Sequence, residues 1–318
     1  MFWFYIFIFL ASFALLFWSG KLLVDALTRV ARFLEWREFV VAFFVMAIAG
    51  SLPNLFVGIS SALHKIPQLS FGEIVGGNVV DLTIVVALAA LIAKGLPAES
   101  RMVQTSSIFT ICIAILPLLL ISDGVLGRGD GIFLILAFAF YTFWLFSKEE
   151  RFKKVYDENK ISTTKEFKVF IKNLGKVILG IIFLLVASEG IVKSAQFFAG
   201  SFNLPIAIIG ILIVGLGNTL PEAYFAIASA RKGQTWMILG NLMGAIMVPA
   251  TLVVGIVALI CPIEIVDFSP FAIGRLFLII SAIFFLLVVR SGQKITKKEA
   301  LVLLGIYILF VTVEILMR

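Results

Sequence analysis

Three acidic residues of this 318-residue chain, Glu73, Asp81 and Glu222, lie inside or at the edge of long apolar runs. A charged side chain in the hydrocarbon core of a bilayer is costly, so it normally faces a cavity or a partner. We therefore predict functional roles for Asp81 and Glu222. Glu73 is near the end of its run, where an interfacial or salt-bridged role is at least as well supported. Carboxylates in such places bind cations or, with a raised pKa, carry protons.

The sequence motifs around these acids occur twice in the chain. Gly50-Ser-Leu-Pro-Asn54 returns as Asn218-Thr-Leu-Pro-Glu222, and Gly72-Glu-Ile-Val-Gly-Gly77 returns as Gly240-Asn-Leu-Met-Gly-Ala245. Both pairs are offset by 168 residues, so no insertion separates the two motifs within either copy. A repeat of this kind inside apolar helices predicts two related halves with an ion site where they meet.

The prolines of the first motif, Pro53 and Pro221, fall in the middle of apolar runs. Each should free the backbone carbonyl four residues earlier, that of Ala49 or of Gly217. Within a bilayer such a carbonyl needs a partner, and hard cations accept carbonyl oxygens as ligands. A plain proline kink is the alternative, but two kinks in register beside a carboxylate favour an ion site. Further side-chain oxygens at this depth belong to Ser51, Asn54, Asn218, Thr219 and Glu222.

The second motif contains the small-residue pairs Gly72/Gly76 and Gly240/Gly244. Such pairs allow the spans that carry them to approach other helices closely, and alone they indicate only packing. Asp81 lies one turn beyond Gly77 on the same helix face. We therefore expect its carboxylate near the broken second span.

Composition defines the setting of these motifs. The chain is 61% hydrophobic and 14% charged, with a mean hydropathy of +1.12. Apolar runs of about 20 residues, each able to cross a hydrocarbon core of about 30 Å, recur along its length. These values exclude a soluble domain and predict an all-α polytopic membrane protein. We expect the first run, residues 2–18, to be a retained helix because it lacks a signal peptide's flanks.

We predict ten membrane spans in two halves. The first half, residues 1–147, and the second, residues 173–318, are joined by a polar cytoplasmic linker at 148–172. Five spans per half place the halves in opposite orientations, which makes the repeats inverted. The predicted spans are 2–20, 39–63, 70–94, 104–122, 130–147, 173–197, 204–229, 237–260, 271–290 and 299–317.

The basic residues predict the orientation. With the N-terminus outside, 21 of the 26 Lys and Arg residues fall on the inner side, so both termini are expected outside the cell membrane. The same loop clusters account for the net charge of +7 without nucleic acid as a partner. The cysteines, Cys112 and Cys261, have no metal-ligand spacing, and the lone histidine, His64, is expected to face headgroups. No nucleotide loop or metalloprotease pattern is present, so we predict neither an enzyme nor a bound cofactor.

The repeated motifs resemble the α-repeats of the cation/Ca²⁺ exchanger superfamily, best known from sodium/calcium exchangers. The family pattern is close to G-T/N-S/T-L-P-E followed by G-N-x-x-G-S-N-x-x-N/D. The first copy here reads Ala49-Gly-Ser-Leu-Pro-Asn54 with Gly72-Glu-Ile-Val-Gly-Gly-Asn-Val-Val-Asp81. The second reads Gly217-Asn-Thr-Leu-Pro-Glu222 with Gly240-Asn-Leu-Met-Gly-Ala-Ile-Met-Val-Pro249.

This resemblance implies ten helices in two inverted five-helix repeats and antiport by alternating access. It implies that the first and sixth helices move across a core formed by the second, third, seventh and eighth. Transported Ca²⁺ and Na⁺ are then the ligands. The cation-binding set implied here is Ser51, Asn54, Asn78, Asp81, Asn218, Thr219 and Glu222, with the backbone at Ala49 and Gly217.

The chain departs from the family pattern at several site positions. Asn54 replaces the first repeat glutamate, Gly77 and Ala245 replace serines, and Pro249 replaces the second-copy Asp or Asn. Asp81 adds an acid, so the four acid or amide positions carry a formal charge of −2, against −3 for Glu, Asn, Glu and Asp. Two carboxylates still balance one Ca²⁺, but less remains to hold several Na⁺.

Na⁺/Ca²⁺ exchange is therefore the leading interpretation. Exchange of another pair, involving H⁺, K⁺ or a different divalent ion, is the first alternative. A non-transporting membrane protein that kept the scaffold is the second. Oxygens that converge on one cavity favour retained ion binding, whereas Pro249, Gly77 and Ala245 count against it.

Overall fold

The structure is a computed structural model, and it describes residues 1–33, 48, 50–99, 101–147, 163–233 and 235–317. Its first half is mostly helical in the described residues. The helices of this half are α1 (Phe2–Phe33), α3 (Leu52–Leu63), α4 (Pro67–Val80), η2 (Asp81–Val85), α5 (Val86–Ile92), α6 (Arg101–Leu120), η3 (Ile121–Asp123) and α7 (Arg128–Ser147).

The second half repeats this order. Its helices are α8 (Thr163–Phe202), α9 (Ile206–Ile208), η5 (Ile209–Val214), α10 (Gly215–Asn218), α11 (Leu220–Arg231), α12 (Thr235–Val248), η6 (Pro249–Val253), α13 (Val254–Ile260), α14 (Ser269–Ser291) and α15 (Lys297–Leu316). The elements α3, α4, η2 and α5 become α11, α12, η6 and α13 when 168 is added to their bounds. The repeat seen in the motifs thus extends to the helix boundaries.

Eight described helices are long and apolar enough to cross a membrane. The predicted fifth span corresponds to α7, and the predicted second span ends in α3, with 39–47 and 49 outside the described residues. The predicted limits 2–20 and 173–197 are too short, because α1 runs to Phe33 and α8 from Thr163 to Phe202. Apolar runs mark only the part of a helix inside the bilayer, and these helices continue beyond it. Of the predicted linker, 148–162 lies outside the described residues.

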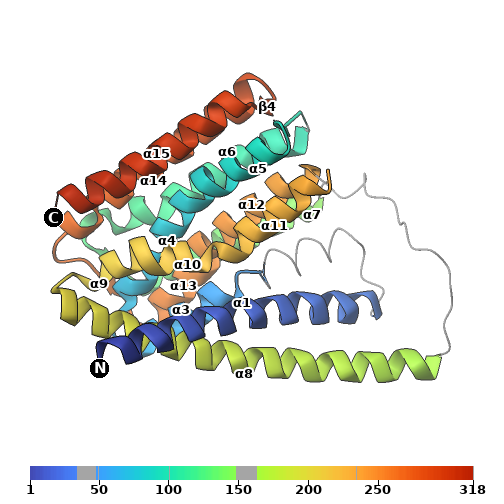
Figure 1. Cartoon of the computed structure of the whole chain (residues 1–318), viewed down its shortest axis with the longest axis horizontal. Helices are drawn as coiled ribbons and strands as arrows, with labels where there is room; N and C mark the ends of the chain where they lie inside the picture. Colours follow the sequence, from blue (N-terminus) through green and yellow to red (C-terminus); the bar gives the residue numbers. More distant parts are fainter. Residues whose placement is uncertain (34–47, 49, 100, 148–162, 234, 318) are drawn as a thin grey trace.

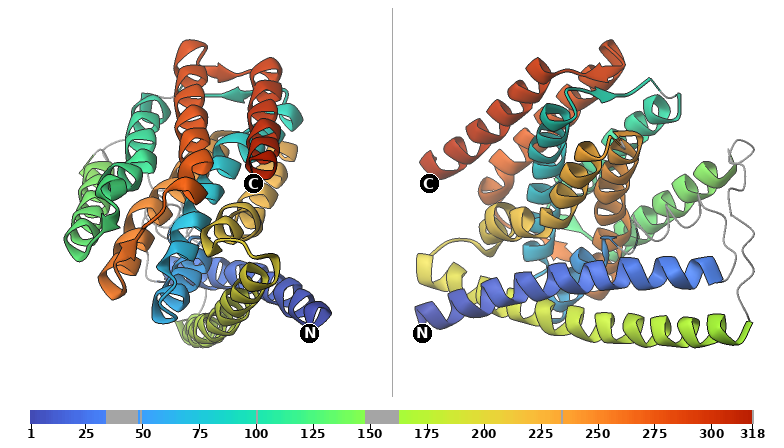
Figure 2. Two further views of the ribbon diagram at one scale, coloured as in Figure 1. Left: turned by 90° about the vertical axis from the view of Figure 1, so that its left-hand side faces the viewer. Right: turned by 45° about the vertical axis from the view of Figure 1, so that its right-hand side comes forward.

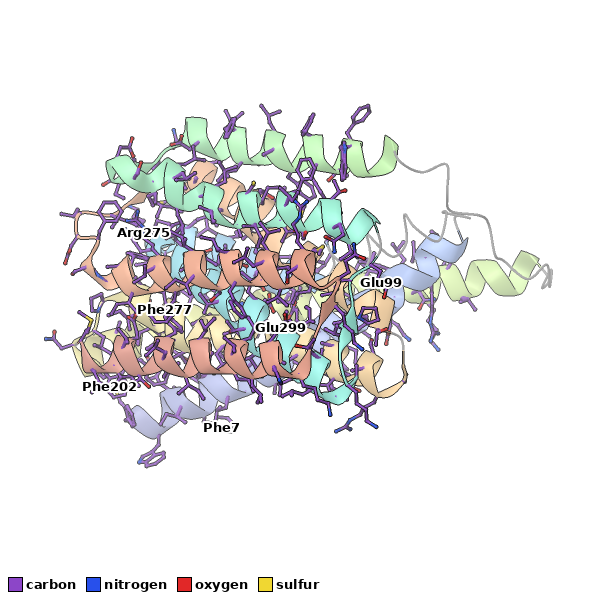
Figure 3. All side chains as sticks on the ribbon, turned by 90° about the horizontal axis from the view of Figure 1, so that it is seen from above. Phe7, Glu99, Phe202, Arg275, Phe277 and Glu299 are labelled. Carbon is purple, nitrogen blue, oxygen red and sulfur yellow. The ribbon has the colours of Figure 1, made fainter. Side chains whose placement is uncertain are left out.

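Four two-residue strands join the halves. The strand β1 (Leu96–Pro97) pairs antiparallel with β4 (Lys294–Ile295), and β2 (Val125–Leu126) pairs with β3 (Ile263–Glu264). Each pair takes one strand from each half, at equivalent loops of the repeat. Figure 3 shows Glu99 and Glu299 toward one end of the bundle, and Arg275 and Phe202 toward the other. Both chain ends lie at this second end (Figure 1).

The third and eighth spans form the centre of the bundle. In their most apolar windows, 83% and 72% of the residues are buried, against 22% and 17% for the spans in α1 and α8. A helix buried on all sides is covered by other helices, whereas a mostly exposed apolar helix faces lipid. The central position of α4, η2 and α5, and of α12, η6 and α13, is the fold's main contribution to the site.

The helices α1 and α8 form a separate antiparallel pair along one side of the bundle (Figures 1 and 2). Tyr5 stacks on Phe197 with ring centroids 4.0 Å apart, and Phe9 meets Phe198 edge to face at 5.3 Å. A Cβ at Gly180 would meet Leu23, so this glycine allows the close approach of the two helices. The apolar cluster of the pair also contains Val57 of α3, Leu69 of α4, and Ile209 and Val214 of η5, which attach it to the rest of the bundle.

Candidate functional site

The second and seventh spans are both interrupted at the repeated Leu-Pro. In each, the residue before the leucine, Ser51 or Thr219, has φ −87° and ψ −1°, outside the usual α-helical range. A new helix, α3 or α11, begins directly after it, with its proline in the first turn. The predicted similarity of the two breaks is confirmed, and it follows from the missing N–H and the ring of proline.

The third and eighth spans contain a π-helical turn at equivalent places, η2 from Asp81 and η6 from Pro249. The hydroxyl of Thr83 donates to the Val79 carbonyl, and that of Thr251 donates to the Met247 carbonyl at 2.6 Å. A single π-turn widens a helix locally, and such turns are frequent at functional sites. The two turns lie at the level of the helix breaks and shape the centre of the molecule.

Asp81 and Glu222 are brought together at this centre. Their side chains are 3% and 9% exposed, and their charges lie close enough to interact. Asp81 lies against the seventh span, since η2 packs against α11. Its predicted closeness to the break of the second span stays a prediction. The inverted halves interlock, so the third span of one half meets the broken span of the other. The two acids therefore come from different halves.

Of the other predicted site residues, Ser51 lines one pocket together with Glu222. Ser51, Asn78, Asn218 and Thr219 are buried, Asn54 and Gly217 are half-buried, and Ala49 lies outside the described residues. The Thr219 hydroxyl donates to the Leu216 carbonyl at 3.0 Å, and Gly217 packs against the Phe13 ring of α1. Several buried oxygens accept no hydrogen bond from the described residues: Asn54 Oδ1, Glu73 Oε2, Asp81 Oδ1, Asn218 Oδ1 and Glu222 Oε2. Such oxygens are what an incoming cation would take as ligands.

The position of Glu73 in the structure differs from the sequence prediction. Instead of facing the interface or pairing with a base, it is 1% exposed, and Asn218 Nδ2 donates a hydrogen bond to its Oε1. The reason is that α4 begins at Pro67 and is covered on all sides from its first turns. Glu73 directly follows Gly72 within the glycine seam, and this position is the sequence signal that could have placed it among the site residues. The centre of the protein thus holds three carboxyl groups instead of two.

The first glycine seam explains how α4 reaches Asn218. A Cβ at Gly72 would collide with the backbone of Ala207, and one at Gly76 with that of Ile211. The predicted close approach of the third span is confirmed, and its partner is the first part of the seventh span. At the equivalent Gly240, a Cβ would meet none of the described residues within 4 Å. The positions equivalent to Ala207 and Ile211, 39 and 43, lie outside the described residues.

A pocket of about 100 Å³ reaches this centre from one side. Its lining comes from α1, the second-span break, α11 and α12: Val24, Gly50, Ser51, Pro221, Glu222, Phe225, Asn241 and Ala245. Within the described part of the chain, no three His, Cys, Asp or Glu side chains converge to hold a metal. Any cation bound here must combine one or two carboxylates with amide, hydroxyl and carbonyl oxygens.

Known proteins share this architecture. The chain is 26% identical to the inner membrane protein YrbG of Escherichia coli over 92% of its own length and 91% of that protein. It is 23% identical to the sodium/calcium exchanger MaX1 of Methanosarcina acetivorans over 91% and 92% of the two chains. A structure of the sodium-calcium exchanger NCX_Mj matches with a TM-score of 0.67 and 23% identity, over 98% of this chain and 99% of the other.

The likeness to NCX_Mj establishes the fold, an all-α bundle of ten membrane helices in two inverted repeats. The family model described as sodium/calcium exchanger protein matches residues 4–147 and 172–316. These two segments include both helix breaks, the π-turns that begin at Asp81 and Pro249, and the buried carboxyl groups of Glu73, Asp81 and Glu222. The chain is therefore a multi-pass membrane transporter of the sodium/calcium exchanger family, and not an enzyme.

Proposed function

We propose that this protein is a secondary active antiporter that exchanges Na⁺ for Ca²⁺ by alternating access. The observation that carries the proposal is the buried Asp81–Glu222 pair at the meeting point of two interrupted helices. Two carboxylates match the charge of one Ca²⁺ or of two Na⁺. Competition of the two ions for the same charges is the physical basis of exchange.

The ligands we propose extend from this pair to the neutral oxygens around it. Asp81 and Glu222 supply the charge, and the carbonyls of Ala49 and Gly217 supply backbone oxygens at the breaks. Neutral side-chain oxygens are proposed from Ser51, Asn54, Asn78, Asn218 and Thr219. The unpaired buried oxygens of Asn54 and Asn218 support this part of the set.

The same charges explain how transport would be coupled. An empty site exposes two carboxylates, whose removal from water is costly in a low-dielectric interior. A bound cation neutralises them, so the loaded site can be closed off from water and passed to the other side. We propose that sliding of the α1–α8 pair across the core exposes the site alternately to the two sides.

The orientation we propose has both termini outside the plasma membrane, on the basis of the Lys and Arg distribution. In this orientation α12 begins at the cytoplasmic face, next to Arg231 and Lys232. The pocket, which is lined by the first turns of α12, then faces the cytoplasm.

The test is uptake of radioactive Ca²⁺ into proteoliposomes under imposed gradients of Na⁺, H⁺ or K⁺. We expect uptake driven by an outward Na⁺ gradient and abolished when Na⁺ is equal on both sides. Uptake that follows only an H⁺ or K⁺ gradient would assign a different ion pair. The substitution of Asn54 and Pro249 for the acid or amide residues of the family pattern favours that second function. Absence of flux under every gradient would reject transport itself.

A further inference from the structure

The pocket has an equivalent on the other side of the pseudo-symmetric centre, which the repeat offset identifies. Adding 168 to Gly50 and Val24 gives Asn218 and Val192, and subtracting 168 from Asn241 gives Glu73. These equivalent positions are closed, since Asn218, Val192 and Glu73 are 2%, 0% and 1% exposed. In the part of the chain that the structure describes, one passage is therefore open and its equivalent on the same backbone plan is closed.

One contact of the closed passage has no equivalent in the open passage. Asn218 Nδ2 donates a hydrogen bond to Glu73 Oε1, which joins α10 of the second half to α4 of the first. In the open passage the place of Asn218 is taken by Gly50, which has no side chain with which to reach Asn241. A Cβ built at Gly50 would meet none of the described residues within 4 Å, so these residues leave space for a side chain there.

A second contact is also present at the closed passage and missing at the open one. Glu189 of α8 accepts a hydrogen bond from Ser60 Oγ at 3.0 Å and pairs with His64 Nε2 at 3.2 Å, which fastens α8 to the end of α3. The equivalents on the open side are Lys21 for Glu189, Ala228 for Ser60 and Lys232 for His64. A lysine opposite an alanine and a second lysine cannot form this contact.

We propose that these two contacts, Asn218–Glu73 and Glu189 with Ser60 and His64, act as a lock that keeps one passage shut in the resting protein. The proposal rests on the proposed function only in treating the pocket as a cation passage. Where two states share a backbone plan, the balance between them depends on the side chains that differ. The lock must open before the site can face the other side of the membrane.

The first experiment gives the closed passage the residues of the open one. Glu73→Asn and Asn218→Gly are combined in a chain with Cys112→Ala and Cys261→Ala, and Val192→Cys serves as the reporter. Sealed vesicles are treated with a membrane-impermeant maleimide on one side or the other. We expect Val192→Cys to react about tenfold faster in this variant than in the parent, from the side opposite to that which labels Val24→Cys.

The second experiment is the reverse transplant. Gly50→Asn with Asn241→Glu should form the missing contact and make Val24→Cys at least severalfold less reactive. General misfolding would increase labelling at both reporters, so opposite shifts in the two transplants separate the lock from a folding defect. Glu189→Ala should increase Val192→Cys labelling. Lys193→Ala is the matched control, because Lys193 pairs with Glu189 within α8 and joins no two elements.

Unchanged labelling of Val192→Cys in both the Glu73/Asn218 variant and Glu189→Ala would overturn the lock. Labelling requires no transport, so the two proposals fail separately. A labelling shift in these variants, together with no Ca²⁺ flux in the protein without the lock substitutions, would leave the lock standing and reject the antiport. Ca²⁺ flux in that protein without any labelling shift in the variants would support the antiport and reject the lock.

Discussion

The two halves of this protein share one backbone plan and differ in the chemistry placed on it. Both interrupt a helix with the same dihedral angles at Ser51 and Thr219, and both widen the following span with a π-turn. Yet the first half contributes Asp81 where the second has Pro249, and the second contributes Glu222 where the first has Asn54. Repeated motifs thus specify geometry, whereas the residues that differ specify charge, packing and conformational preference.

The largest expected effect concerns the acid that each half contributes. We predict that Asp81→Asn and Glu222→Gln each abolish cation-gradient-driven Ca²⁺ flux in proteoliposomes. Loss of one of two buried charges should cost about 3 kcal/mol of cation binding, roughly a 100-fold loss of affinity. Glu99→Gln, at an exposed carboxylate, is the control and should transport normally. Normal transport by either site variant would mean that its half does not contribute an essential charge.

The two glycine seams should differ in their tolerance of a methyl group. Gly72→Ala places a Cβ against the Ala207 backbone and should destabilise the protein by about 1–3 kcal/mol. Gly240→Ala, at the equivalent position, meets none of the described residues and should leave stability unchanged or raise it slightly. Thermal unfolding of both variants in detergent measures the difference. Equal losses would contradict the asymmetric packing.

The π-turns that begin at Asp81 and Pro249 should lose the same stability when their threonine hydroxyls are removed. Thr83→Val and Thr251→Val each remove a buried hydroxyl that donates to the carbonyl four residues earlier. Each should cost about 1 kcal/mol, with no difference between the halves. If only one variant lost stability in thermal unfolding, the two turns would not be equivalent.

The smallest effect is expected in the loops before the fourth and ninth spans, where Glu99 and Asp267 are equivalent. Hydrogen bonds from the Ser269 hydroxyl and backbone N–H lower the pKa of Asp267. A lowered pKa in the folded state stabilises the protein above the unfolded pKa of about 4, and this contribution is lost as the pH falls. Ser269→Ala should reduce the slope of stability against pH below about 4.

Much of the fold was predictable from sequence, because the composition of a short segment is enough to identify a membrane helix. An apolar run of sufficient length must form a helix, since no other backbone arrangement satisfies its N–H and C=O groups in lipid. The Leu-Pro breaks were predictable for a similar reason, since proline interrupts a helix wherever it stands inside one. Helix ends at Phe33 and Thr163 were not, because beyond the bilayer hydropathy no longer marks the helix.

The candidate site was predictable only in part. Asp81 and Glu222 drew attention as acids in apolar runs, but their proximity across the two halves depends on how the halves interlock. Glu73 is also an acid in an apolar run, but it lies near the end of that run, which suggested a position at the membrane interface. Its burial against Asn218 depends on the glycine seam, which admits the backbone of the seventh span.

By itself the sequence determined the membrane setting, the two related halves, the helix breaks and the acids available for ion binding. These follow from composition and from motifs repeated at one offset, which act over a few neighbouring residues. Only the tertiary structure decided which acids meet, what fills the first glycine seam and, among the described residues, which of two equivalent passages is open. Those outcomes depend on contacts between residues more than a hundred positions apart, such as Asn218 with Glu73 and Ser60 with Glu189. Pairings at that range are set by packing of whole helices, which no local pattern encodes.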